Sequence, residues 1–203
     1  MVLIDVGETL TRAYLPHHGV ISLVVNLAKG ERVQVAMIGR DSILGAFSAL
    51  GDPIALDSAV VLVPGVASTL DLDRLRSTAE RSSDLRALLV RHGLAMHAQT
   101  LHTAGCNALH TVESRLARCL SQIHDLSGDV RLDLTQEALA HMIGARRNSV
   151  SLVAGTLQQS NFVRYSRGRI DIINLEGLRN TACECYLTVK AQYDRLLRDH
   201  FPS

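Results

Sequence analysis

The stretch Leu134–Asn174, LTQEALAHMIGARRNSVSLVAGTLQQSNFVRYSRGRIDIIN, decides the fold of this 203-residue chain. Thr135 precedes a short run with apolar residues at helical spacing, so its hydroxyl can cap a helix. Gly144 suits the left-handed position at which that helix ends, and a second helix can begin a few residues later. The spacing therefore predicts two short helices joined at a steep angle, a helix-turn-helix.

The second predicted helix has one apolar face and one polar face. The apolar residues share one side at 100° per residue, and they are Val150, Val153, Ala154 and Leu157. The opposite side carries Asn148, Ser151, Leu152 and Gly155, with Arg147 at its flank. Such a helix can pack against its neighbour and still present polar side chains outward.

Residues 162–165 and 169–173 alternate as strands around Arg167 and Gly168, which predicts a two-stranded wing with a basic tip. Between Met142 and Asp171 the chain has five arginines and one acid, although its formal net charge is only +1. Such a local positive charge is typical of a surface that contacts phosphates. Solvated arginines on a plain core element are the alternative, but duplex DNA is the better interpretation.

Residues 111–174, and above all the motif LTQEALAHMIGARRNSV, resemble the C-terminal domain of the CRP/FNR family of bacterial transcription regulators. In that family the start of the second helix enters the major groove, so the resemblance implies a guanine-reading role for Arg147. Cyclic-AMP-responsive members have a glutamate and a second arginine where this chain has Asn148 and Leu152, which suit adenine and a thymine methyl. The expected DNA-binding residues are Thr135, Gln136, Arg146, Arg147, Asn148, Ser149, Ser151, Leu152, Arg167 and Arg169.

Upstream, the β-branched runs 20–27, 32–38 and 59–63 predict short strands of a small barrel or roll. The segment YLPHHGVISLVVNLAKGERVQVAMIGRDSILGAFSALGD resembles the family's cyclic-nucleotide-binding roll. Family members have a leading helix and first strands before the position of Gly7, so the chain is expected to begin inside the roll. The fold class is thus α+β: an incomplete, cupin-like N-terminal β-roll, a long dimerisation helix and a C-terminal winged helix-turn-helix.

The loop from Ile43 to Val61 contains the positions at which the family's cyclic-nucleotide binders hold their ligand. Cyclic-nucleotide binders of the family use a Gly-Glu pair for the ribose and an Arg-Ser pair for the phosphate, whereas this chain has Ala46 after Gly45 and Asp57 before Ser58. An aspartate repels a phosphate, so cyclic AMP is not expected to bind in the family's manner. Gly45, Ser58 and Thr100 remain candidates for an effector pocket, and the cofactor is unknown.

One long helix is expected from Ser83 to Asn107, and the resemblance makes it the dimer helix. Its heptads place Leu85, His92, Gln99 and Cys106 in one register and Leu89, Met96 and Thr103 in the other. A homodimer would set two recognition helices about 34 Å apart on a palindromic operator. Residues 1–80 form the expected roll, 81–110 the dimer helix and hinge, with Gly105 as a weak point, and 111–203 the DNA-binding domain.

Cysteines and histidines raise the question of a metal. His102, Cys106 and His110 recur every four residues, and Cys183 and Cys185 form a C-x-C within a helix expected from about Leu175 to Arg198. Thiols at i and i+2 of an intact helix point about 200° apart, so ordinary packing is favoured and no metal ligand is assigned. Two alternatives stay open: a metal- or haem-dependent redox or gas sensor, and a truncated sensor or dimerisation module that does not bind DNA.

Composition and missing motifs argue against a membrane protein, a single-strand binder and an enzyme. The chain is 47% hydrophobic and 20% charged and has neither an apolar run near 18 residues nor a signal-peptide pattern, so a cytoplasmic location without a membrane partner is expected. Aromatic residues make up 3%, with no Trp, which disfavours stacking of single-stranded nucleic acid. No catalytic motif is present, so no catalytic residue is assigned and an enzyme is not expected. RNA polymerase is a further partner that the resemblance implies.

Overall fold

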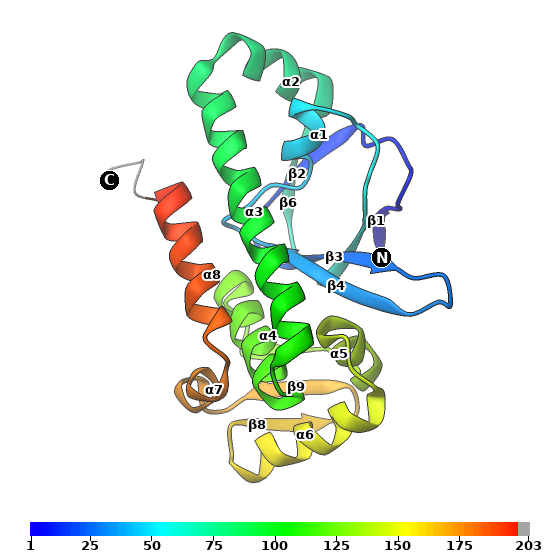
Figure 1. Cartoon of the computed structure of the whole chain (residues 1–203), viewed down its shortest axis with the longest axis vertical. Helices are drawn as coiled ribbons and strands as arrows, with labels where there is room; N and C mark the ends of the chain where they lie inside the picture. The colour runs from blue at the N-terminus through cyan, green and yellow to red at the C-terminus, as the bar shows by residue number, and fades with distance from the viewer. Residues whose placement is uncertain (199–203) are drawn as a thin grey trace.

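The computed structural model describes residues 1–198, in which a long helix, α3 (Ser83–Leu109), connects a β-roll to a helical domain with a small sheet (Figure 1). Three antiparallel sheets have the strand orders β1-β5-β3-β4, β2-β6 and β7-β9-β8. The strands are β1 (Val2–Ile4), β2 (Arg12–Pro16), β3 (Val20–Asn26), β4 (Arg32–Ile38), β5 (Ser58–Val63), β6 (Ala67–Asp71), β7 (Arg131–Leu132), β8 (Val163–Ser166) and β9 (Arg169–Ile172). The three strands expected in the roll are therefore confirmed, within one residue at each end.

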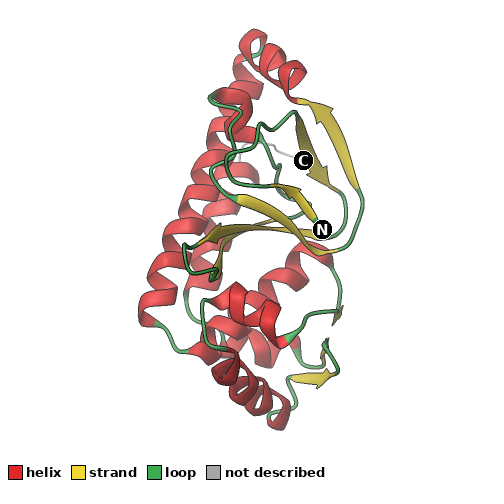
Figure 2. Ribbon diagram, turned by 90° about the vertical axis from the view of Figure 1, so that its right-hand side faces the viewer, coloured by secondary structure: helices red, strands yellow, loops and turns green. Residues whose placement is uncertain are grey.

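Helices cover the roll on one side and form most of the second half of the chain (Figure 2). They are α1 (Ala46–Leu50), α2 (Leu72–Arg81), α3 (Ser83–Leu109), α4 (Val112–Ser127), α5 (Gln136–Ile143), α6 (Arg147–Gln159), α7 (Leu175–Thr181) and α8 (Cys185–Tyr193), which a π-helical turn (Asp194–Arg198) follows. Within residues 1–198 no helix has the length and apolar character needed to cross a membrane.

Strand β3 is covered on both faces. Ile21 belongs to the core of the roll, whereas its neighbour Val20 packs into a second core together with Leu116 and Leu120 of α4. Burial on both faces explains why Val20, Ile21, Leu23 and Val24 are all apolar, and the buried Ser22 donates to Gln34 (2.8 Å). The roll and the helix-turn-helix domain consequently share one continuous packing surface.

Gln99 of α3 joins four parts of the fold. Its amide accepts from the Met37 N–H (2.6 Å) and donates to the Met37 carbonyl (3.2 Å), so it covers the free edge of β4. The same amide donates to the Tyr193 hydroxyl of α8 (2.7 Å) and accepts from Gln122 of α4 (3.1 Å). Gln99 is only 2% exposed, so these hydrogen bonds replace those that water would make.

The long helix expected from Ser83 to Asn107 is confirmed as α3, which continues through Gly105 to Leu109. Its C-cap, His110, is extended, and Thr111 caps α4 by accepting from the Ser114 N–H. The break between α3 and α4 therefore lies at His110 and Thr111, where the hinge is expected, and α3 passes through Gly105 without interruption.

The prediction of one C-terminal helix from Leu175 to Arg198 is wrong. Helix α7 ends at Thr181, Ala182 is extended, and α8 starts at Cys185. The break has a packing reason, since Leu178 lies in the core of the helix-turn-helix domain whereas Val189 packs against α3 and the roll. A single straight helix could not reach both. Residues 199–203 of the expected C-terminal domain lie outside the described residues.

Candidate nucleic-acid interface

Helices α5 and α6 form the predicted helix-turn-helix. The Thr135 hydroxyl accepts from the Ala138 N–H (3.1 Å) and caps α5, and Gly144 ends that helix in the left-handed conformation (φ 57°). Leu139 and Ile143 of α5 are buried in the same core as Val150 of α6. The local signals in the sequence and the packing agree on this motif.

The outward face of α6 carries the residues expected to contact bases. Arg147 and Asn148 are exposed, and Leu152 is 76% exposed, which is unusual for a leucine and leaves its methyl groups free for an apolar contact. Arg146 occupies the N-cap position without a side-chain cap. The first N–H groups of α6 can therefore bind an anion such as a phosphate.

Two of the expected DNA-binding residues bind each other. The Ser151 hydroxyl donates to the Gln136 side-chain oxygen (2.6 Å) and lies 3.1 Å from the Arg147 carbonyl. The pair connects the first turn of α5 to the first turns of α6. It fixes the angle between the two helices and leaves Ser149, which is half-buried, beside the N-terminus of α6.

The wing is a two-residue hairpin between β8 and β9. Arg167 (φ 47°) and Gly168 (φ 81°) both have left-handed backbones, as a type I′ turn requires. A groove of about 510 Å³ separates the wing from the helix-turn-helix. It is lined by Thr135, Gln136, Glu137, Arg147, Tyr165, Arg167 and Gly168.

Arg169 differs from the other arginines of the wing because it already has a partner. Its Nε lies 3.0 Å from the Asp133 carboxylate, and this hydrogen bond raises the pKa of Arg169. Arg131 makes the equivalent contact with Asp171 (2.9 Å). Asp133 lies outside the segment from Met142 to Asp171, and strand β7 brings it to the wing. Arg169 is thus less available to phosphate than Arg167.

The expected heptad positions on α3 are wrong as an intermolecular surface. Leu89, His92, Met96, Gln99 and Cys106 are all buried within their own chain. A different set is exposed, and it alternates spacings of three and four along the helix. This surface, the α3 seam, consists of Ala87, Val90, Leu94, His97, Leu101, Ala104 and Ala108.

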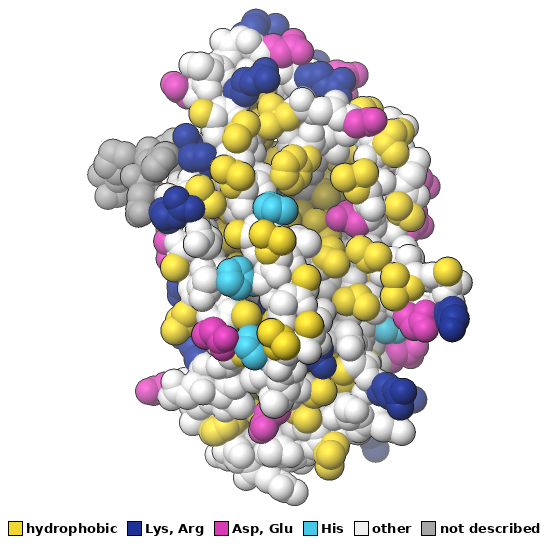
Figure 3. Space-filling model, viewed as in Figure 1, with side chains coloured by type: hydrophobic (Ala, Val, Ile, Leu, Met, Phe, Trp, Pro, Cys, Tyr) yellow, Lys and Arg dark blue, Asp and Glu magenta, His cyan; other side chains and the backbone are white. Residues whose placement is uncertain are grey.

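The α3 seam is apolar for much of its length. Val90, Leu94 and Leu101 are 47%, 52% and 58% exposed. Hydrophobic and histidine side chains follow α3 down the front of the molecule in Figure 3. The sequence contains this pattern, but α3 has a second apolar stripe, which faces the roll and α8. Periodicity alone does not show which of the two stripes is buried within the chain and which stays exposed.

The three candidate effector residues do not share a cavity. Ser58 lines a space of about 120 Å³ between the roll and α5, which Gly45 and Thr100 do not line. The Ser58 hydroxyl donates to the Asp5 carboxylate (2.7 Å) and accepts from Asn26 (2.8 Å). Burial raises the pKa of the neighbouring Asp57. The Asp5 carboxylate thus occupies the hydroxyl of Ser58, and Arg32 lines the same space.

Near the hinge between α3 and α4, the structure brings together four of the five cysteine and histidine side chains that were considered as metal ligands. Cys106, His110, Cys183 and Cys185 have potential ligand atoms within 4.8 Å of one another. The pKa of the Cys106 thiol is lowered to about 5, mainly by a hydrogen bond from Cys183. The expectation that the thiols of Cys183 and Cys185 point about 200° apart is wrong, because Cys183 precedes α8 and is not helical.

The roll, the helix-turn-helix and the wing define a DNA-binding regulator of the winged-helix class. Residues 114–181 match the family model described as the Crp-like helix-turn-helix domain. The chain thus carries a Crp-like helix-turn-helix domain, and the relatives that it resembles are transcription regulators.

Relatives and solved structures agree with this assignment. The chain is 27% identical over 186 residues to the HTH-type transcriptional regulator Cmr of Mycobacterium tuberculosis, covering 89% of this chain and 72% of Cmr. A CRP-family regulator from Thermus thermophilus matches with a TM-score of 0.72 at 16% identity, over 90% of this chain and 93% of the other. FixK2 from Bradyrhizobium japonicum matches with a TM-score of 0.75 at 15% identity and the same coverage. At these low identities, the two structural matches show that the fold is shared.

Proposed function

We propose that the chain acts as a homodimer that reads a palindromic DNA operator through two copies of α6. The observation that carries the dimer is the α3 seam, because exposed apolar residues at alternating spacings of three and four pair helices side by side. A second copy of α3 is the natural occupant, since a two-fold axis matches each seam residue with the same surface on its partner. His97, midway along the seam, would then lie near its symmetry mate.

The proposed reading of DNA uses the outward face of α6. Arg147 would donate to O6 and N7 of a guanine, Asn148 would bind an adenine, and Leu152 would contact a thymine methyl. The phosphate contacts would come from Thr135, Gln136, Arg146, Ser149 and Arg167. Arg169 would join them by releasing Asp133 and binding a phosphate instead. Ser151 would reach a base only by giving up its hydrogen bond to Gln136. Phosphate contacts position the domain, and the base contacts specify the sequence.

The roll would not take cyclic AMP in the family's usual manner. Ser58 already donates to Asp5, and Asp57 precedes it in the chain where cyclic-nucleotide binders have an arginine, so a phosphate there would meet the Asp5 carboxylate and, of the guanidinium groups, only that of Arg32 among the lining residues. A different effector, or none, is proposed. Residues 1–80 would serve as sensor or scaffold, 81–110 as dimer helix and hinge, and 111–203 as the DNA-binding domain. The protein would act in the cytoplasm, together with RNA polymerase.

The first experiment is capture of sheared genomic DNA by the purified full chain, with sequencing of the retained fragments at several salt concentrations. We expect enrichment of one imperfect palindrome whose half-sites are about 34 Å, one helical turn, apart. Featureless retention, or weak binding with little salt dependence, would contradict the proposal and favour the module without competent DNA binding.

The dimer is tested separately by sedimentation of Leu94→Glu and Leu101→Glu. Two negative charges facing each other across a two-fold seam repel, so both variants should sediment as monomers at concentrations at which the parent chain is a dimer. Leu187→Glu is the matched control, because Leu187 is also an exposed leucine on a helix but lies outside the seam. A dimer that survives both seam substitutions would refute this interface.

A further inference from the structure

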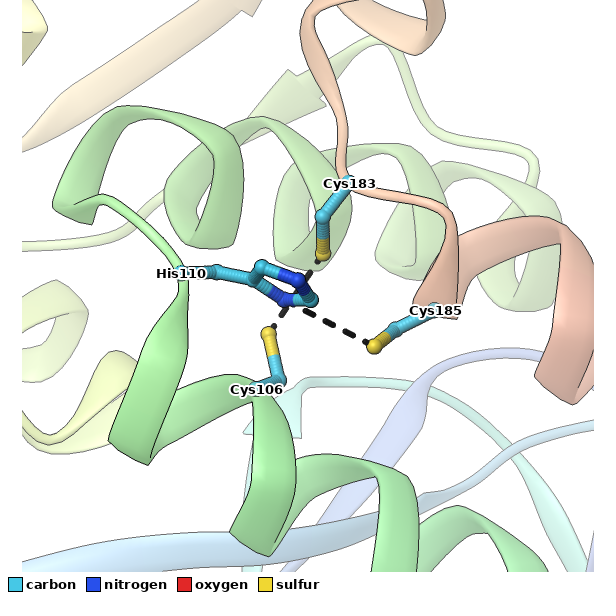
Figure 4. Close-up of side chains that lie close together, drawn as sticks. All are labelled: Cys106, His110, Cys183 and Cys185. Carbon is cyan, nitrogen blue, oxygen red and sulfur yellow. Dashed lines mark hydrogen bonds between the residues drawn. The ribbon is translucent and has the colours of Figure 1, made fainter.

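Four ligand-type side chains converge at the hinge between α3 and α4 (Figure 4). Cys106 lies in the last turn of α3, His110 is the C-cap of that helix, and Cys183 and Cys185 flank the break before α8. The three thiols are buried and the imidazole is half-buried. Two distant segments of the chain, with Cys106 and Cys183 77 residues apart, thus meet at one point.

The spacing of the four ligand atoms fits one ion. The sulfur atoms of Cys106 and Cys183 are 3.5 Å apart, and Cys185 Sγ is 3.7 Å from His110 Nδ1. Thiolates bound tetrahedrally to Zn²⁺ at about 2.3 Å are about 3.8 Å from each other. An iron–sulfur cluster places several atoms between its protein ligands and needs thiolates that are farther apart, so the geometry favours a single ion.

His110 is oriented for metal binding by a neighbouring carboxylate. Its Nε2 lies 3.0 Å from Oε1 of Glu184, the residue between the two cysteines of the C-x-C. A proton on Nε2 that is donated to Glu184 leaves the lone pair of Nδ1 directed at the three sulfurs. Histidine ligands of metals are held in the same way by a carboxylate at the far nitrogen.

The charge of the site is also balanced. Three thiolates and one divalent ion carry a net charge of −1, and a buried negative charge needs a cation. Arg118 of α4 is 3% exposed and contacts the cluster, and its Nε has no hydrogen-bond partner among the described residues. A thiolate sulfur held by an ion would give this buried donor an acceptor.

We propose that Cys106, His110, Cys183 and Cys185 form a tetrahedral site for one thiophilic divalent ion, with Zn²⁺ as the ion whose ligand preference fits best. Binding releases up to three thiol protons and forms three metal–sulfur bonds and one metal–nitrogen bond. The ion ties the hinge to the α7–α8 junction. If the proposed function holds, the bound ion also sets the angle between α3 and α4, and with it the separation of the two α6 helices.

The test measures metal in the full-length chain, purified with reduced thiols and without added metal. We expect about one Zn²⁺ per chain, and a Co²⁺-substituted protein should show the visible absorption of a tetrahedral thiolate complex. Cys185→Ser and His110→Gln should weaken Zn²⁺ binding by more than about a hundredfold, and Glu184→Gln by about ten- to a hundredfold. Cys119→Ala is the matched control, because Cys119 is buried and free but lies outside the cluster.

Several results would overturn the metal site. A parent chain that binds no Zn²⁺ and no Co²⁺, or a Cys119→Ala variant that loses metal as Cys185→Ser does, would overturn the site. A Cys106–Cys183 disulfide in protein handled without air, seen as a loss of two hydrogens in the mass, would overturn it as well. Circular dichroism of Glu184→Gln separates metal loss from misfolding, since Glu184 is exposed.

Coupling to DNA is measured as a second arm, with metal-loaded and metal-stripped protein on the captured operator. We expect the metal to change the DNA dissociation constant by at least about fivefold. Unchanged DNA affinity with metal bound would overturn the coupling and leave the metal site standing. Failure of every form to bind DNA would refute the proposed function, while the metal measurements would still decide the site.

Discussion

Replacing Gln99 by leucine removes the side chain that joins the roll, α3, α4 and α8, while it nearly preserves volume. The N–H and carbonyl of Met37 on the free edge of β4 would lose their partners, and leucine can supply none. A buried polar backbone group without a partner costs about 1–3 kcal/mol, so the two together predict a loss of about 2–6 kcal/mol in the free energy of unfolding. Gln122 and Tyr193 also lose contacts, but Gln122 is half-buried and can turn to water.

Urea unfolding followed by circular dichroism, at one fixed protein concentration, measures this loss. The urea concentration at the midpoint of unfolding should fall, while the slope of the free energy of unfolding against urea concentration stays the same. Thr103→Val is the control, since it replaces another buried polar residue of α3 without changing its shape. A loss below about 1 kcal/mol for Gln99→Leu, or an equal loss for Thr103→Val, would show that Gln99 does not hold the two halves together.

Three further outcomes are expected. Arg147→Ala should cost about 1–3 kcal/mol on the captured operator and relax the preference for guanine at one position, as measured by fluorescence anisotropy with single-base variants. Arg167→Ala should weaken binding to all duplexes about equally and lower the salt slope by about 1, and an unchanged slope would remove the wing tip from the interface. Burial lowers the pKa of His92 from 6.5 to about 4, and its Nε2 accepts from the Ile43 N–H. The folded state therefore keeps His92 neutral, and the free energy of unfolding should fall by about 3 kcal/mol in total as pH drops from about 6.5 through about 4. His92→Gln retains an acceptor for Ile43 and should lose this part of the pH dependence; equal pH profiles for parent and variant would contradict the assignment.

The winged helix-turn-helix could be predicted because each of its signals is local in the chain. Thr135 caps α5, Gly144 ends it, and Arg167 with Gly168 closes the wing within neighbouring residues. Caps, left-handed glycines and two-residue turns depend on the backbone of a few adjacent residues, so they act before distant contacts form. The strands of the roll and the length of α3 could be predicted for the same reason.

Contacts between distant segments of the chain decide which side chains of α3 are buried and which partner Arg169 has. Helix α3 has apolar residues around most of its circumference, and only the packing of the roll and α8 shows that Gln99 and Cys106 face inward while Leu94 and Leu101 stay exposed. The pairing of Arg169 with Asp133 depends on strand β7, which lies outside the charge count made from the sequence.

The cysteine cluster shows the same division most clearly. The sequence by itself determined that this chain carries a Crp-like helix-turn-helix with a basic wing, because helix caps, turns and periodicity are properties of neighbouring residues. Only the tertiary structure decided that Cys183 and Cys185 meet Cys106 and His110, since the break between α7 and α8 arises from packing against α4 on one side and α3 on the other. Such competition between two distant surfaces leaves no local signal in the chain.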